Sequence, residues 1–166
     1  MFYIIIFIIA LYMAYNAKHS FTIVKDCFFD VENNKIHAFL LDNTYYYGEY
    51  TLSIYDGSCL LNGTGKIIYK NNYTFVGNFY SNMKHGEGIL YHNENSIFKY
   101  AIHNYTYDEI STTSKIVYKD EKYYIGKYNN LTKLDDGIMY YPNNTNYTGS
   151  FKFIEYVNYS FVEIEN

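Results

Sequence analysis

Aromatic residues recur on alternate positions around a glycine along this chain. Four segments have the form aromatic-x-Gly-x-aromatic and are centred on Gly48, Gly77, Gly126 and Gly149. Because alternate side chains of an extended strand share one face, both aromatic side chains of each segment lie on the glycine's side of a sheet. Residues 98–102 fit as a fifth, degenerate copy. The pattern predicts a repeat protein built from β-strands.

A second glycine signal fixes the length of the repeat. It consists of Gly63 with Gly65, Gly86 with Gly88, and Gly137 alone. One constant interval joins Ile36 to Gly48, Gly65 to Gly77, Gly88 to Tyr100, Ser114 to Gly126 and Gly137 to Gly149. Within each interval an apolar residue comes early, and an asparagine, which tolerates positive φ, comes seven residues in at four of the five copies. Each interval is therefore expected to form a strand, a tight turn and a second strand.

The connection between the two glycine signals varies in length. It is six residues longer from Gly48 to Gly65 than in the copies that start at Gly77 and Gly126. Variable length within a repeat is typical of a loop that packs against nothing, so residues 53–59 are expected to project as a finger. Phe79 belongs to the aromatic stripe that stacked repeats would bury, so its replacement should be costly, whereas the loop residue Asn82 should tolerate replacement.

The glycines and their aromatic neighbours together resemble a known repeat. Residues 75–88, which run from Phe75 to Gly88, are similar to the MORN (membrane occupation and recognition nexus) repeat, and Tyr141-Pro142 matches the turn of that family. The repeat-defining residues are Tyr46, Gly48, Tyr50, Gly63, Gly65, Phe75, Gly77, Phe79, Gly86, Gly88, Tyr124, Gly126, Tyr128, Gly137, Tyr147, Gly149 and Phe151. The sequence departs from the family at Tyr50 and Tyr128, where tryptophan is usual, and at Tyr100 and Ser114, where glycine is lost.

The resemblance implies an all-β protein, an elongated and twisted antiparallel meander of MORN-type hairpins. A short hydrophobic helix is expected before it. The expected parts are a signal peptide or short membrane anchor (1–20), a capping segment (21–35), about five repeat units with a degenerate middle one (36–153) and a C-terminal strand or tail (154–166).

The segment 1–15 is apolar and uncharged. As a helix it would extend roughly 22 Å, short of a hydrocarbon core of about 30 Å. This length suits the core of a signal peptide, although no basic residue precedes it and the cleavage pattern is poor. An uncleaved anchor, or a buried strand or helix, remains an alternative.

Seven N-x-S/T acceptors, more than the composition predicts by chance, support the secretory route. They are Asn62, Asn72, Asn104, Asn130, Asn143, Asn146 and Asn158. Asparagine in turns followed by threonine in strands would produce some of these triplets without glycosylation. Cys27 and Cys59 either pair, closing a loop that stabilises the fold by roughly 3 to 4 kcal/mol, or remain two separate buried thiols.

The composition narrows the function classes. The formal charge is -4 and the chain has no arginine, because all 13 basic residues are lysine, so nucleic acid is not an expected partner. His92 and His103, with Glu94 and Asp108 nearby, are the one candidate for a metal or acid–base site, and structural roles suit them better. No catalytic residue, metal or cofactor is therefore expected.

The sequence favours a non-enzymatic scaffold, secreted or membrane-tethered, that binds an unidentified protein partner through its tyrosine-rich sheet, since the chain carries 24 Tyr and 12 Phe. The alternative is a peripheral phospholipid-binding module on the cytosolic face of a membrane. Exposed aromatic edges also make a homodimer conceivable.

Overall fold

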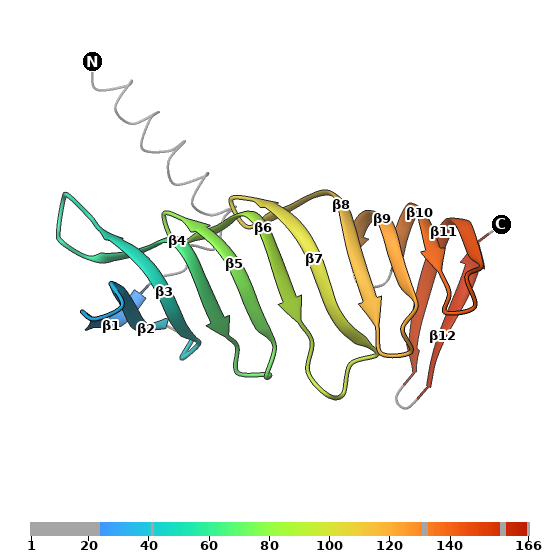
Figure 1. Ribbon diagram of the computed structural model, residues 1–166, viewed down its shortest axis with the longest axis horizontal. Coiled ribbons are helices and arrows are strands. Elements are labelled where there is room, and N and C mark those ends of the chain that lie inside the picture. The colour runs from blue at the N-terminus through green and yellow to red at the C-terminus, as the bar shows by residue number, and fades with distance from the viewer. Residues whose placement is uncertain (1–23, 41, 131–132, 157–158, 166) are drawn as a thin grey trace, which may run out of the picture.

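The computed structural model describes residues 24–40, 42–130, 133–156 and 159–165. These residues form an all-β antiparallel meander, as the sequence predicts, and every strand pairs with its neighbours in chain order in one sheet. Figure 1 shows the sheet extended along one axis and twisted from end to end. The expected N-terminal helix, within residues 1–20, lies outside the described residues.

The strands are β1 (Val24–Asp30), β2 (Lys35–Leu40), β3 (Tyr45–Leu52), β4 (Cys59–Ile68), β5 (Thr74–Tyr80), β6 (Met83–Tyr91), β7 (Phe98–Thr106), β8 (Glu109–Tyr118), β9 (Tyr123–Asn130), β10 (Lys133–Tyr140), β11 (Asn146–Tyr156) and β12 (Tyr159–Glu165).

One row of paired residues crosses the sheet from β2 to β11 and contains most of the repeat glycines. It reads Ile36, Gly48, Gly65, Gly77, Gly88, His103, Ser114, Gly126, Gly137 and Gly149. We call it the glycine row. The face of the sheet toward which the side chains of this row point is called the inner face. The row beside it is apolar, with Ala38, Tyr46, Ile67, Phe75, Leu90, Ala101, Ile116, Tyr124, Met139 and Tyr147.

The expected position of the middle repeat is wrong by three residues. Gly88 pairs with His103, and not with Tyr100, so the degenerate copy is residues 101–105 rather than 98–102. The separation of His103 and Ser114 in the chain then equals that of Gly77 and Gly88 and that of Gly126 and Gly137. The irregularity lies instead in the β6–β7 turn.

Turn hydrogen bonds give the reason for this shift. After β2, β4, β8 and β10 the closing backbone bond spans four residues, as from Tyr69 N to Tyr73 O. After β6 it joins His92 N to Lys99 O and spans seven. The other four turns share a positive φ at one position, occupied by Asn43, Asn72, Glu121 and Asn144. Asn95 has no positive φ among the described backbone angles, because the longer turn does not need one there.

The turns on the opposite long edge follow β3, β5 and β7 (Figure 1). The β5–β6 and β7–β8 turns each have two consecutive residues of positive φ, the geometry favoured in two-residue hairpins. In each, the second residue bonds back to an earlier strand: Asn82 exchanges hydrogen bonds with the Leu61 backbone, and Asp108 with the Lys84 backbone. Asn82 is therefore not the replaceable loop residue that the sequence suggested.

Buried side chains on the inner face form two hydrophobic clusters. The first extends from β2 to β7 and includes Tyr46, Phe75 and Phe79; the second extends from β7 to β11 and includes Tyr124 and Phe151. Each buried aromatic ring adds about 4 to 6 kcal/mol of gross hydrophobic stabilisation. The single sheet is thus held together by a layer of rings on one face.

Candidate functional site

Three aromatic rings of the inner face, those of Tyr46, Phe75 and Tyr124, each lie over two glycines of neighbouring strands. A Cβ added at Gly65 would collide with the ring of Tyr46, one at Gly88 with Phe75, and one at Gly137 with Tyr124. The phenol of Tyr46 donates to the Glu49 carbonyl at 2.6 Å, and that of Tyr124 to the Lys127 carbonyl at 2.9 Å. The rings of Tyr46, Phe75 and Tyr124 and the glycines beneath them thus serve packing.

The middle repeat replaces this arrangement with a buried polar pair. Ala101 stands at the ring position, and the space above the sheet holds the His103 imidazole, whose Nδ1 lies 2.7 Å from the Ser114 hydroxyl. Burial lowers the pKa of His103 to about 4, with smaller contributions from His92 and Lys84, so the ring is neutral. Its centroid lies 4.9 Å from that of Tyr128.

A serine beside a histidine resembles half of a hydrolytic site. Here His103 and Ser114 are 3% and 2% exposed, so a substrate cannot reach the hydroxyl. The two side chains fill the space that an aromatic ring occupies in the regular hairpins, and they are hydrogen-bonded to each other.

The other residues considered for chemistry have structural partners. His92 packs between Tyr73 and Phe98, and burial lowers its pKa to about 4. Asp108 lies 3.8 Å from Lys84, which sits over the rings of Phe75 and Tyr105. No group of three metal-ligating side chains is found among the described residues.

A pocket of about 330 Å³ lies beside the long β6–β7 turn. Its lysines are already engaged: Lys119 Nζ donates to the carbonyls of Asn93 and Glu94, and Lys122 Nζ lies 2.8 Å from Asp120 and over the Tyr118 ring. The Lys119 bonds hold the β6–β7 turn against the β8–β9 turn, whereas the Lys122 contacts lie within the β8–β9 turn. These contacts account for both lysines without a ligand.

The outer face carries two continuous rows that we call the outer band. The first is His37, Tyr47, Lys66, Val76, Ile89, Ile102, Lys115, Ile125, Ile138 and Thr148; the second is Phe39, Tyr45, Ile68, Thr74, Tyr91, Tyr100, Val117, Tyr123, Tyr140 and Asn146. These positions include no aspartate or glutamate, although the chain as a whole is acidic. Their exposed apolar members are Phe39, Ile68, Val76, Tyr91 and Ile125.

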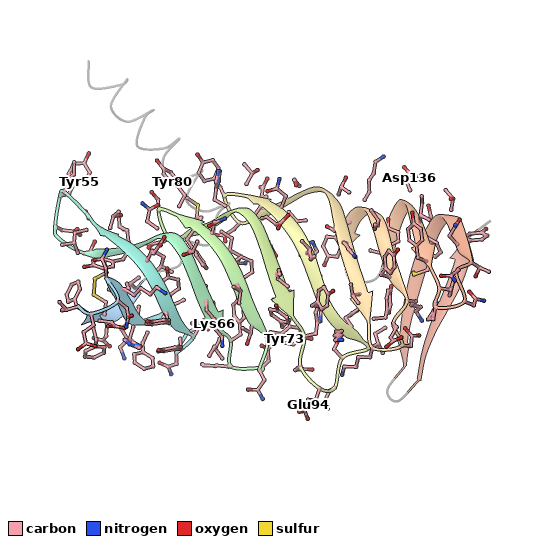
Figure 2. The ribbon with its side chains drawn as sticks, viewed as in Figure 1. Tyr55, Lys66, Tyr73, Tyr80, Glu94 and Asp136 are labelled. Atoms are coloured by element: carbon pink, nitrogen blue, oxygen red, sulfur yellow. A yellow bond between two sulfur atoms is a disulfide. The ribbon has the colours of Figure 1, made fainter. Side chains whose placement is uncertain are left out.

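The loop between β3 and β4, residues 53–58, projects as the sequence predicts. Figure 2 shows Tyr55 at its tip, on the same long edge as Tyr80, whereas Tyr73 and Glu94 lie on the opposite edge. At its base Cys59 forms a disulfide with Cys27 of β1, across β2 and β3.

The glycosylation acceptors differ in accessibility. Exposed acceptors are Asn72 and Asn143 in turns, Asn104 in β7 and Asn146 at the start of β11. Asn62 is half-buried in β4, Asn130 ends β9, and Asn158 lies outside the described residues.

Sequence inspection missed the His103–Ser114 pair and the outer band. Counting back from Ser114 by the separation of Gly77 and Gly88 would have found His103, with Tyr105 as the second aromatic of that copy. The outer band has no such signal, because its rows exist only once the register of all strands is known.

No protein-family model matches the sequence, and no curated protein matches it. Among the described residues, no helix is long and apolar enough to cross a bilayer. Since no relative indicates a family, the class of protein is defined by its fold: an antiparallel meander of one sheet with an aromatic inner face.

Proposed function

We propose that the chain is a non-enzymatic, MORN-like repeat protein that acts as a protein-interaction scaffold, either secreted or membrane-tethered. The observation that carries the proposal is the outer band, a mainly apolar and aromatic surface that extends over ten strands with no carboxylate among its positions. Surfaces of this kind usually mark an interaction site.

The composition of the outer band suits a protein partner. Tyrosine is enriched in the centres of interfaces because it offers a large contact area at low entropic cost. Several rings are already ordered by neighbours, as in the stacked pair Tyr123 and Tyr140, whose centroids are 4.7 Å apart. The charged side chains of the band are Lys66 and Lys115, so the complementary partner surface is apolar with carboxylates at its rim.

The same lysines favour a second candidate, a module that binds anionic phospholipid on the cytosolic side. A lysine near an anionic bilayer contributes about 1 kcal/mol, so two of them provide weak attachment. The Cys27–Cys59 disulfide supports the secretory location instead, because disulfides persist in oxidising compartments.

A matched pair of variants tests the proposal. Val76 and Asn78 are both exposed on the outer face of β5, and Val76 belongs to the band whereas Asn78 does not. Proteins that co-purify with the full-length chain are quantified for wild type, Val76→Asp and Asn78→Asp, and the affinity of each candidate is then measured with purified protein. We expect Val76→Asp to weaken binding at least tenfold and Asn78→Asp less than twofold.

Equal binding by both variants would exclude the band as the interaction surface. Sedimentation with phosphatidylcholine vesicles that contain phosphatidylserine tests the second candidate, the phospholipid-binding module. Vesicle binding that is lost in Val76→Asp, without a protein partner, would favour the phospholipid module.

A further inference from the structure

The finger between β3 and β4 is closed by its own hydrogen bonds. Ser53 N donates to the Ser58 carbonyl at 2.8 Å, and Gly57 N, in a residue with φ of 70°, donates to the Ser53 carbonyl at 2.9 Å. Asp56 accepts from both the backbone and the hydroxyl of Ser58. The loop therefore holds a defined shape although it packs against no other element.

The base of the finger is fixed as well. Cys59, the residue that follows the loop, is buried and bonded covalently to Cys27, and Leu61 two residues further on is fully buried. The disulfide ties the start of β4 to the edge strand β1. A closed loop on a fixed base loses little conformational entropy on binding.

The tip carries two large side chains that are almost completely in water. Ile54 is 89% and Tyr55 93% exposed, and Tyr55 has the highest exposure of the large hydrophobic residues that the structure describes. They contribute nothing to the core of this sheet. Tyrosine is one of the residues enriched in interface hot spots, which fill pockets on the partner.

The charge of the finger indicates what kind of partner fits. Residues 53–58 carry the carboxylate of Asp56 and no lysine or histidine. Hydrogen bonds from Ser53 and Ser58 lower the pKa of Asp56, which keeps it ionised. Such a tip is repelled by an anionic bilayer and complements a protein pocket with a basic rim.

We infer that Ile54 and Tyr55 form a preformed plug that inserts into an apolar pocket of a protein partner, with lysine or arginine at the pocket's rim opposite Asp56. The inference rests on the proposed scaffold function and assigns a second contact, separate from the outer band. The disulfide at the base serves to hold the plug in place.

Site-specific photo-crosslinking on the full-length chain tests the plug. Benzoylphenylalanine replaces Tyr55 in one sample and Val31 in another, because Val31 is an equally exposed apolar residue (87%) in the β1–β2 turn. In cells that make the protein naturally, we expect a light-dependent adduct with one protein from position 55 and not from position 31. The purified adduct partner is then titrated with variants.

We expect Tyr55→Ser and Ile54→Ser each to weaken that binding at least tenfold, Val31→Ser less than twofold, and Asp56→Asn at least twofold with reduced salt dependence. A lipid adduct, an adduct no stronger than that from position 31, or unchanged affinity of Tyr55→Ser overturns the inference. Because all four side chains are exposed, the thermal unfolding midpoint should match wild type. Val76→Asp, measured alongside, reports on the scaffold function independently, so loss of one contact does not mimic loss of the other.

Discussion

The regular hairpins and the middle hairpin solve the same packing problem in different ways. In β5–β6 the ring of Phe75 lies over Gly77 and Gly88, and a side chain at either glycine would collide with it. In β7–β8 the ring is absent at Ala101, and the two glycine positions hold His103 and Ser114, which bond to each other.

This difference shows that the ring and its two glycines form one unit. A ring needs glycines beneath it, and once the ring is lost the glycine positions require side chains to fill the space. A buried imidazole would be costly without a partner, and the Ser114 hydroxyl provides that partner. The loss of the ring at Ala101 and of the glycines at His103 and Ser114 is thus one compensated change.

The largest effect is expected from removing a ring in a regular hairpin. Phe75→Ala should lower the free energy of unfolding by about 3 to 5 kcal/mol, because it leaves a cavity above two glycines that nothing else can fill. Urea unfolding of the full-length chain measures this loss. Val76→Ala, on the outer face of the same strand, serves as the control and should cost far less; similar losses for both variants would show that the inner face is not the core.

A smaller loss is expected from adding a ring to the middle hairpin. Ala101→Phe should lower the free energy of unfolding by up to about 3 kcal/mol, because the ring would overlap His103 and Ser114. Replacing both of these residues by glycine in the same chain should recover most of the loss, since it rebuilds the regular unit.

The double glycine variant without the ring is the control, and it should be destabilised by the cavity alone. If Ala101→Phe remained destabilised after both glycines were introduced, the ring and glycine positions would not form one unit.

Much of the sheet could be predicted from sequence because the constraint is local and repeated. The all-β meander follows from alternation around the glycines, and the finger from the six extra residues after Gly48. The asparagine turns follow from tolerance of positive φ at Asn43, Asn72 and Asn144.

The middle repeat could not be placed because the constant interval, as from Gly65 to Gly77, was assumed where the turn is longer. Tyr100 offered an aromatic residue at the expected distance from Gly88. In the structure Tyr100 pairs with Tyr91 instead, because the turn closed by the His92–Lys99 bond is longer than the others. The candidate surfaces were hidden for a related reason. The outer band depends on the register of ten strands. The exposure of Ile54 and Tyr55 depends on whether another element packs against the finger, which the sequence does not reveal.

The smallest expected effect concerns pH, because the middle hairpin contributes a titratable group to the glycine row where the regular hairpins have glycine. Burial lowers the pKa of His103 to about 4, below the ordinary value of about 6.5. The unfolded chain therefore binds more protons between these values, and the stability from neutral His103 is complete above pH 6.5 and lost as the pH falls toward 4.

Between pH 7.5 and 5.5, wild type should lose about 1 kcal/mol of unfolding free energy through His103. The pKa of His92 is lowered in the same way, so His92 adds a similar loss. His103→Gln should reduce the pH dependence, and the double variant with His92→Gln should remove most of it. Urea unfolding at the two pH values measures the difference, and an unchanged pH dependence in His103→Gln would mean that the imidazole is not held neutral in the fold.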